Sequence, residues 1–138
     1  MDEAKRELVQ NWLVIAQRDL GGARKLASPP DPYPELAIYH CQQSAEKVVK
    51  GFLTYHDRRF EKTHDIVGLI LLAAQVSERF TEWLPAGRLL TPYASEFRYP
   101  EERLMPEPAE YEQAWKAAKD LYEFVLALLP ADVHPPIG

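Results

Sequence analysis

The sequence at positions 36–50 is Leu36-Ala37-Ile38-Tyr39-His40-Cys41-Gln42-Gln43-Ser44-Ala45-Glu46-Lys47-Val48-Val49-Lys50, and its spacing predicts one helix. At about 100° per residue, one narrow arc of this helix is polar and the opposite side is apolar. The polar arc, called the seam from here on, consists of His40, Gln43, Lys47, Lys50 and Thr54. The apolar side consists of Ala37, Cys41, Ala45, Val48, Val49 and Phe52. The pattern predicts a helix that packs through one side and presents imidazole, amide and ammonium groups on the other.

A second imidazole follows in Thr63-His64-Asp65, which has the composition of a helix start. A histidine there would lie at the positive end of a helix dipole. Imidazoles and cations grouped in this way suit a phosphate-bearing ligand. The candidate ligand-binding residues are His40, Gln43, Lys47, Lys50, His64 and Arg98.

The length and composition predict one globular domain. The chain has 138 residues, 46% of them hydrophobic and 27% charged, with a formal net charge of −5. Such a chain can bury about two thirds of its unfolded surface. The charge argues against broad attraction to nucleic acid, although Arg58, Arg59 and Lys62 form a local basic patch. The single cysteine, Cys41, excludes an intramolecular disulfide, and no signal peptide or membrane-spanning run is visible, so we expect a cytoplasmic protein.

Helical periodicity and proline punctuation predict about five helices and no strands. The expected ranges are residues 2–27, 34–56, 63–79, 85–97 with a bend at Pro92, and a last helix after Pro106-Glu107-Pro108. Short connections between amphipathic helices favour an all-α, up-and-down antiparallel bundle. We expect the bundle to occupy residues 1–129 and the proline-rich tail, residues 130–138, to be mobile.

One carboxylate interrupts the first predicted helix. Asp19 falls within a stripe that we expect to face the core, composed of Leu8, Trp12, Ile15, Ala16, Ala23 and Leu26. An unpaired buried charge costs several kcal/mol. We therefore expect Asp19 to form a structural ion pair with a cation such as Arg98 or Lys47.

Simpler interpretations exist for most of these residues. The seam is equally well explained as a solvated helix face, and Glu46 as a partner for Lys50 one turn away. His64 suits a structural histidine at a helix start, and Arg98-Tyr99-Pro100 an ordinary helix end.

The chain resembles the HEPN family of small helical proteins. The resemblance rests on Tyr39 to Lys47 with Lys50 downstream, on Thr63-His64-Asp65, and on Tyr93 through Phe97-Arg98-Tyr99-Pro100, and it covers residues 5–129. It is closest to stand-alone proteins encoded beside minimal nucleotidyltransferases. This implies a helical homodimer that offers a composite groove to a nucleotidyltransferase or its nucleotide, with no cofactor and no metal.

Many HEPN proteins are metal-independent ribonucleases with an Arg-x(4–6)-His motif. The corresponding arginine here resembles Arg98, but no histidine follows it at that spacing. A literal match, Arg59 to His64, spans the loop before the third predicted helix. In the toxin branch a tyrosine modified by the nucleotidyltransferase lies two residues after the histidine, and here that position is Ile66.

The preferred hypothesis is a non-catalytic HEPN module that binds a nucleotide or a partner nucleotidyltransferase. One alternative is a ribonuclease toxin in which Arg59 and His64 of two protomers cut RNA. Another is a purely structural dimerisation domain. The ribonuclease requires Arg59 and His64 to converge in an open cleft, whereas the module requires only an accessible seam.

Overall fold

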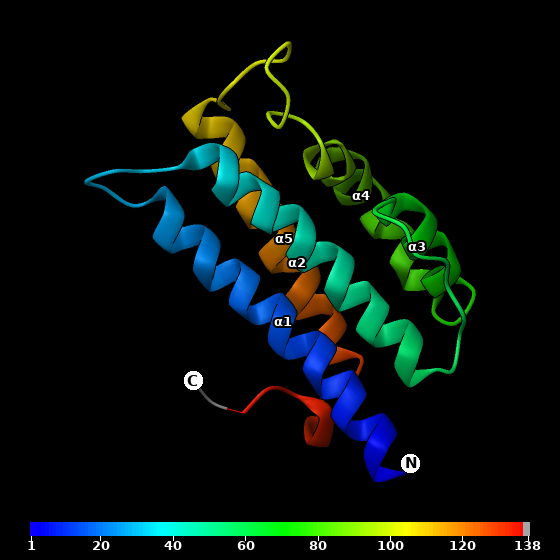
Figure 1. Ribbon diagram of the computed structural model, residues 1–138. Coiled ribbons are helices and arrows are strands. Elements are labelled where there is room, and N and C mark those ends of the chain that lie inside the picture. Colours follow the sequence, from blue (N-terminus) through cyan, green and yellow to red (C-terminus); the bar gives the residue numbers. More distant parts are fainter. Residues whose placement is uncertain (137–138) are drawn as a thin grey trace.

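The computed structural model describes residues 1–136, and every regular element among them is a helix (Figure 1). Its helices are α1 (Glu3–Ala27), α2 (Pro34–Tyr55), α3 (Ile66–Ala74), α4 (Leu84–Leu90) and α5 (Pro108–Ala127). Short 3₁₀ segments are η1 (Glu78–Trp83), η2 (Thr91–Ala94) and η3 (Ala131–Val133). The helices pack antiparallel, which confirms the predicted all-α bundle. None of the described helices is long and apolar enough to cross a membrane.

Helix α2 is the central element, because α1, α5 and the α3–α4 layer all pack against it (Figure 1). The close approach of α1 depends on Gly51, where an added Cβ would lie 3.1 Å from the Trp12 Cβ and 3.2 Å from the Leu13 Cδ2. The Ser44 hydroxyl donates to the Ala16 carbonyl at 2.9 Å, which satisfies a polar group inside this contact. The Cys41 thiol is fully buried, and burial raises its pKa to about 12.

Helix α1 packs through a face that overlaps only partly with the one that we predicted: Ala16 and Ala23 of the predicted stripe are fully buried. It begins at the N-cap Asp2, whose side chain accepts from the Lys5 backbone N–H. Its buried residues are Val9, Leu13, Ala16, Leu20 and Ala23. The prediction was wrong for Leu8 and Ile15, which are 50% and 45% exposed. The buried face is turned from Leu8 and Ile15 toward Val9 and Leu13, and its alanines allow α1 to lie close to α2.

The third and fourth helices are shorter than predicted. The third begins at Ile66 rather than at residue 63, because the Thr63 hydroxyl accepts from the Asp65 N–H in a local turn. It ends at Ala74, and the chain continues in η1. The fourth ends at Leu90, since Pro92 cannot donate an intrahelical hydrogen bond and the chain tightens into η2.

Helix α5 faces the core with Ala114, Ala118, Leu121 and Val125, all fully buried. Its start is held by a capping box between Glu107 and Glu110.

The described part of the tail contacts the bundle, and its mobility stays a prediction. Val133 is fully buried, and the His134 Nε2 donates to the carbonyls of Leu126 and Leu129 at 2.9 and 3.0 Å. The Gln10 side chain of α1 donates to the His134 carbonyl at 2.9 Å. These contacts join residues 133 and 134 to α1 and α5, while residues 137–138 lie outside the described part.

Candidate functional site

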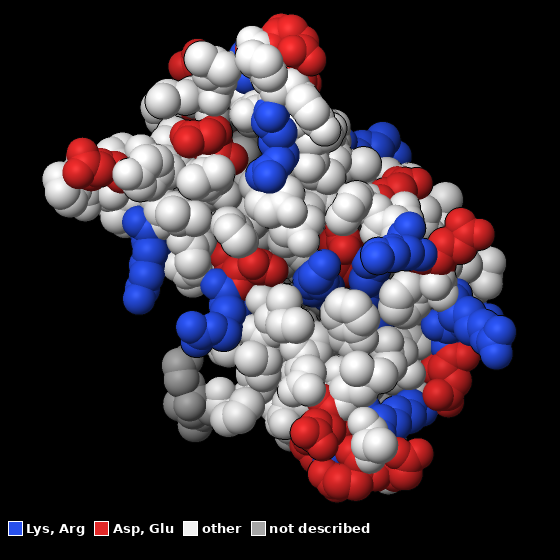
Figure 2. Space-filling view, in the orientation of Figure 1, with Lys and Arg blue, Asp and Glu red and all other residues white. Residues whose placement is uncertain are grey.

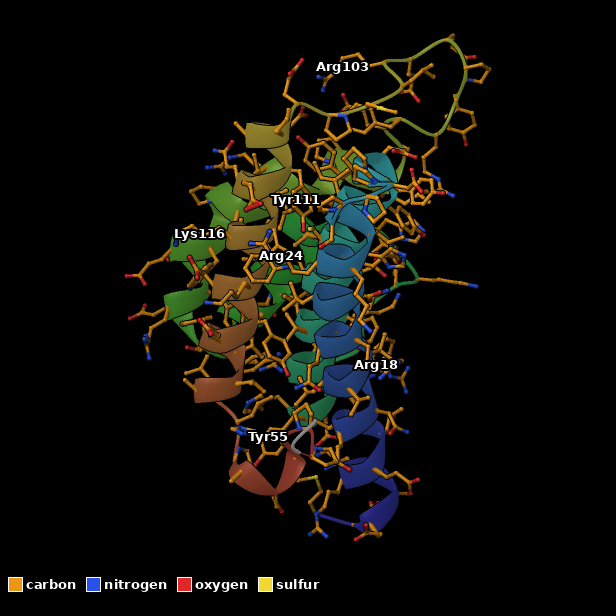
Figure 3. The ribbon with its side chains drawn as sticks, turned by 90° about the vertical axis from the view of Figure 1, so that its left-hand side faces the viewer. Arg18, Arg24, Tyr55, Arg103, Tyr111 and Lys116 are labelled. Atoms are coloured by element: carbon orange, nitrogen blue, oxygen red, sulfur yellow. The ribbon has the colours of Figure 1, made fainter. Side chains whose placement is uncertain are left out.

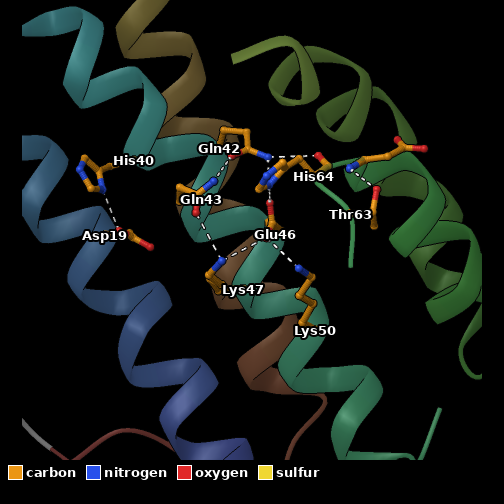
Figure 4. A network of polar contacts seen from close by, with 10 residues as sticks. Asp19, His40, Gln42, Gln43, Glu46, Lys47, Lys50, Thr63 and His64 are labelled. Carbon is orange, nitrogen blue, oxygen red and sulfur yellow. Dashed lines mark hydrogen bonds and ion pairs between the residues drawn. The ribbon is translucent and has the colours of Figure 1, made fainter. Parts of the chain in front are cut away.

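The centre of the candidate site is Glu46, a carboxylate that is 1% exposed. Its Oε2 accepts from the Lys50 Nζ at 2.8 Å and from the Lys47 Nζ at 3.1 Å. Its Oε1 accepts from the His64 ring at 2.8 Å and from the Gln42 amide at 3.3 Å. These five residues, shown in Figure 4, are called the Glu46 cluster below. A carboxylate so deeply buried is tolerated because donors satisfy both of its oxygens.

The Glu46 cluster keeps its carboxylate ionised. Burial alone would raise the pKa of Glu46, but the hydrogen bonds from Lys50, His64 and Lys47 outweigh burial and lower it to about 2. At neutral pH the cluster therefore holds a fixed negative charge between two ammonium groups.

The Glu46 contact fixes the orientation of His64. A carboxylate only accepts hydrogen bonds, so the proton of this contact is on the His64 Nδ1. The Nε2 is left free on a side chain that is 66% exposed. Contrary to the sequence prediction, His64 lies before α3 rather than in its first turn, and its carbonyl accepts from the Gln42 amide at 3.1 Å.

A second carboxylate–histidine pair joins α1 to α2. The His40 Nδ1 and the Asp19 Oδ1 are 2.8 Å apart, and the Asp19 side chain is 15% exposed. Burial raises the pKa of Asp19, and the hydrogen bond from His40 opposes this shift. Asp19 therefore has a partner from the second helix, as its position suggested, but the partner is a histidine rather than Arg98 or Lys47.

The remaining seam residues are connected through amides. The Gln43 amide donates to the Gln42 Oε1 at 2.6 Å, and the Lys47 Nζ donates to the Gln43 Oε1 at 3.3 Å. The Thr54 hydroxyl donates a hydrogen bond to the Lys50 carbonyl at 2.8 Å.

Aromatic rings flank the two lysines of the cluster. The Trp12 ring centroid lies 6.0 Å from the Lys47 Nζ and 5.9 Å from the Lys50 Nζ. The Phe60 ring lies 5.7 Å from the same Lys50 atom and packs edge-on against Trp12. Cation–π attraction and burial of the aliphatic stems hold both ammonium groups in place.

Arg98 lies apart from the Glu46 cluster. Its guanidinium is 4.4 Å from the centroid of the Tyr39 ring, and that ring packs edge-on against His40 at 5.5 Å. The structure thus connects Arg98 to the seam only through Tyr39.

Arg59 and His64 do not both line the cavity beside α3. Arg59 lines an open cavity of about 610 Å³ beside α3, together with Phe60, Glu61, Thr63, Asp65, Gly68, Leu69 and Leu72. His64 is not among these lining residues and is turned toward Glu46 on α2.

The interpretation of Glu46 as a partner for Lys50 is confirmed, but neither Glu46 nor Gln42 was predicted to belong to the site. Both are almost fully buried, whereas glutamate and glutamine are usually exposed. A signal was present, because Glu46 can reach Lys50 one turn away and Lys47 next to it, but the third donor comes from the loop before α3.

The site as a whole is nearly balanced in charge. Figure 2 shows basic and acidic side chains lying side by side across the middle of this face. The carboxylates of Asp19 and Glu46 oppose the ammonium groups of Lys47 and Lys50, and each histidine is held by one carboxylate. No group of three metal-ligating side chains comes together within residues 1–136.

Comparison with known proteins agrees with this architecture. The family model described as "HEPN domain" matches residues 9–128. The chain is similar to an archaeal HEPN homologue whose crystal structure is known, with 26% identity and a TM-score of 0.67. That match covers 87% of this chain and 96% of the archaeal chain. A comparison with curated proteins gives no match. Because the family model spans most of the chain, the protein belongs to the HEPN domain family.

Proposed function

We propose that the chain is a non-catalytic HEPN module that binds the phosphate group of a nucleotide, free or presented by a partner nucleotidyltransferase, and that acts as a homodimer. The observation that carries the proposal is the buried Glu46, which holds Lys47, Lys50 and His64 in fixed positions around one point. Donors held in place lose little conformational entropy when a ligand binds.

Two groups of the Glu46 cluster have hydrogen-bonding positions left for a ligand. An ammonium has three donors, and the Lys47 Nζ spends two of them on Gln43 and Glu46. The His64 Nε2 is free and exposed. A phosphate oxygen beside them would gain a charge-assisted hydrogen bond from Lys47 without disturbing Glu46. The His64 Nε2 adds a second one when the ring carries a proton on both nitrogens.

The positions of Arg98 and Arg59 within residues 1–136 of one chain are a reason to prefer a binding role. Arg98 packs on Tyr39 and has no histidine after it at the ribonuclease spacing. Arg59 faces a cavity that His64 does not line.

Calorimetric titration of the full chain with ATP tests this proposal. Lys47→Ala should weaken binding by about tenfold, because one charge-assisted hydrogen bond is worth about 1.5 kcal/mol or more. The matched control is Lys116→Ala, since Lys116 lies on α5 and is 77% exposed. Binding that is lost equally in both variants, or in neither, would argue against a phosphate site at the seam.

A ribonuclease is a second candidate, because Glu46 orients His64 as a carboxylate orients an acid–base histidine. Under this hypothesis the chain would cut single-stranded RNA in EDTA and leave cyclic phosphate ends. His64→Ala would then reduce cleavage by a factor of about 10² or more, whereas His56→Ala would not. We expect no such cleavage by the wild-type chain.

A further inference from the structure

The C-terminal end of α1 and the N-terminal end of α5 border a hollow of about 370 Å³. Arg24 lines it from α1, and Tyr111 and Glu112 line it from the first two turns of α5. Five prolines also line it: Pro29, Pro32, Pro34, Pro106 and Pro108. This hollow is called the proline pocket below. None of these residues belongs to the seam or to the Glu46 cluster, so the pocket is a separate place on the molecule.

The prolines make the wall of the pocket stiff and apolar. The proline ring locks φ, and its nitrogen carries no N–H, so these residues offer a ligand ring carbons rather than donors. Sites for small molecules are mostly apolar, with a few polar groups that fix the orientation of the ligand. In the proline pocket those groups are Arg24, Glu112 and Tyr111. The remaining polar side chain, Ser28, donates to the Arg24 carbonyl at 2.6 Å.

Arg24 and Glu112 place opposite charges in the pocket. The Arg24 Nη1 donates to the Glu112 Oε1 at 2.8 Å and to its Oε2 at 3.1 Å, which lowers the pKa of Glu112 and keeps it ionised. The guanidinium also lies 3.7 Å from the centroid of the Trp115 ring. Because these contacts with Glu112 use only Nη1, the Arg24 Nη2 and Nε have donors left for a ligand. The two side chains are 42% and 59% exposed, so they can move apart.

Tyr111 adds a donor that lacks an acceptor. The residue is 4% exposed, and its buried hydroxyl has no hydrogen-bond partner within residues 1–136. An unpaired buried hydroxyl destabilises a fold, and few occur in native proteins. Burial raises the pKa of Tyr111 to about 12 and Arg24 opposes this shift, so the hydroxyl keeps its proton at neutral pH. The Arg24 guanidinium lies 5.7 Å from the centroid of the Tyr111 ring, and Figure 3 shows both side chains between α1 and α5. An oxygen held by Arg24 would therefore lie close to this hydroxyl.

We propose that the proline pocket binds a free α-amino acid with an apolar side chain. The carboxylate of the ligand accepts hydrogen bonds from the Arg24 guanidinium and from the Tyr111 hydroxyl. Its ammonium donates to the Glu112 carboxylate, and its side chain lies against the prolines. Binding opens the direct contact between Arg24 and Glu112, which as an exposed ion pair contributes little to stability. This site goes beyond the phosphate binding proposed above and does not depend on it.

Charge balance favours an amino acid over a simple acid or a simple amine. The pocket already holds one positive and one negative side chain. An acid bound to Arg24 would lie next to the Glu112 carboxylate, and an amine bound to Glu112 would lie next to the Arg24 guanidinium. Each of these ligands would therefore be repelled by a like charge. An α-amino acid carries both charges close together and compensates both side chains at once.

Nuclear magnetic resonance of the isotope-labelled full chain tests the proposal, with leucine as the probe. The Trp115 indole N–H donates to the Leu20 carbonyl at 3.1 Å and Arg24 stacks on the same ring, so the Trp115 indole signal reports on the pocket. We expect leucine at up to about 10 mM to shift this signal and to leave those of Trp12 and Trp83 unchanged. Trp12 borders the seam. A shift of Trp12 in place of Trp115, or no shift at all, would overturn the proposal.

Two matched tyrosines test the role of the hydroxyl. Tyr111→Phe should weaken leucine binding by about fivefold or more, because one hydrogen bond to the carboxylate is lost. The control is Tyr122→Phe, since Tyr122 also lies on α5 and has a buried hydroxyl without a partner in the described part, but does not line the pocket. Both variants should unfold at a temperature no lower than the wild type, because each loses an unpaired hydroxyl. Equal leucine binding by the two variants would overturn the proposal.

Two fragments of leucine test the class of ligand. Isocaproate is leucine without its ammonium, and isoamylamine is leucine without its carboxylate. We expect each to bind about tenfold more weakly than leucine or worse. Arg24→Gln should weaken leucine binding by a similar factor, whereas Arg18→Gln, at an exposed position of the same helix, should not. Isocaproate that binds as tightly as leucine would identify a site for simple carboxylates and overturn the assignment of an amino acid.

Discussion

At the scale of single residues, Glu46 shows how one buried charge organises a surface. Its neighbours Lys47 and Lys50 are 22% and 7% exposed in their side chains, so both ammonium groups are partly removed from water. Each depends on the carboxylate to compensate for lost hydration. Glu46 therefore positions the groups that a ligand would contact, although Glu46 itself is buried below the surface.

Glu46→Gln should destabilise the fold by about 3 kcal/mol, because the substitution leaves the buried Lys50 ammonium without its counter-charge. Urea unfolding monitored by circular dichroism measures the change. The matched control is Glu123→Gln, which removes an exposed ion pair with Lys119 at the same four-residue spacing. That control should cost less than about 0.5 kcal/mol. Equal losses in the two variants would show that the Glu46 carboxylate is not buried.

At the scale of elements, α1 shows why a helix can be predicted correctly and its core face wrongly. The spacing of Leu8, Trp12 and Ile15 is as regular as that of Val9, Leu13 and Leu20. Both stripes satisfy helical periodicity, so the sequence alone does not choose between them. The choice is made by the fit of α1 against Gly51 of α2, which is a tertiary contact.

The two faces of α1 can be told apart by truncation. Leu13→Ala should cost about 2–5 kcal/mol, because Leu13 is fully buried and its loss opens a cavity. Leu8→Ala should change the stability of the monomeric fold by less than about 0.5 kcal/mol. Chemical denaturation at a concentration where the chain is monomeric provides the measurement. A larger loss in Leu8→Ala than in Leu13→Ala would restore the face first predicted from the sequence.

At the scale of the whole molecule, most of the fold could be predicted and much of the site could not. Prolines 29, 34 and 108 mark the ends of α1 and the starts of α2 and α5, so these helices follow from local signals. His64 was predicted within a helix because its neighbours resemble an N-cap. Its contact with Glu46 depends on a loop that crosses from α2 to α3, and no local pattern encodes that path.

The free energy of unfolding of the whole chain should decrease in acid, because Glu46 stabilises the fold only while it is ionised. The native pKa of Glu46 is about 2, below its ordinary value of 4.5. Its stabilisation is complete above about pH 4.5 and is lost as the pH falls toward 2, by up to about 3 kcal/mol. The raised pKa of Asp19 has the opposite sign and offsets a part of this loss. Urea unfolding between pH 6 and pH 3 should show a steeper decline for the wild type than for Glu46→Gln, and parallel declines would contradict the assignment.

Because Cys41 is buried, we expect thiol reagents not to modify the native chain. Its sulfur is fully buried and its pKa is raised to about 12, so a maleimide or nitroxide reagent meets no thiolate while the bundle is closed. A new cysteine on an exposed position of α1 would therefore be labelled alone, and the distance between spin labels in two copies could be measured directly. The rate at which Cys41 itself is slowly modified would then report the rate at which the bundle opens.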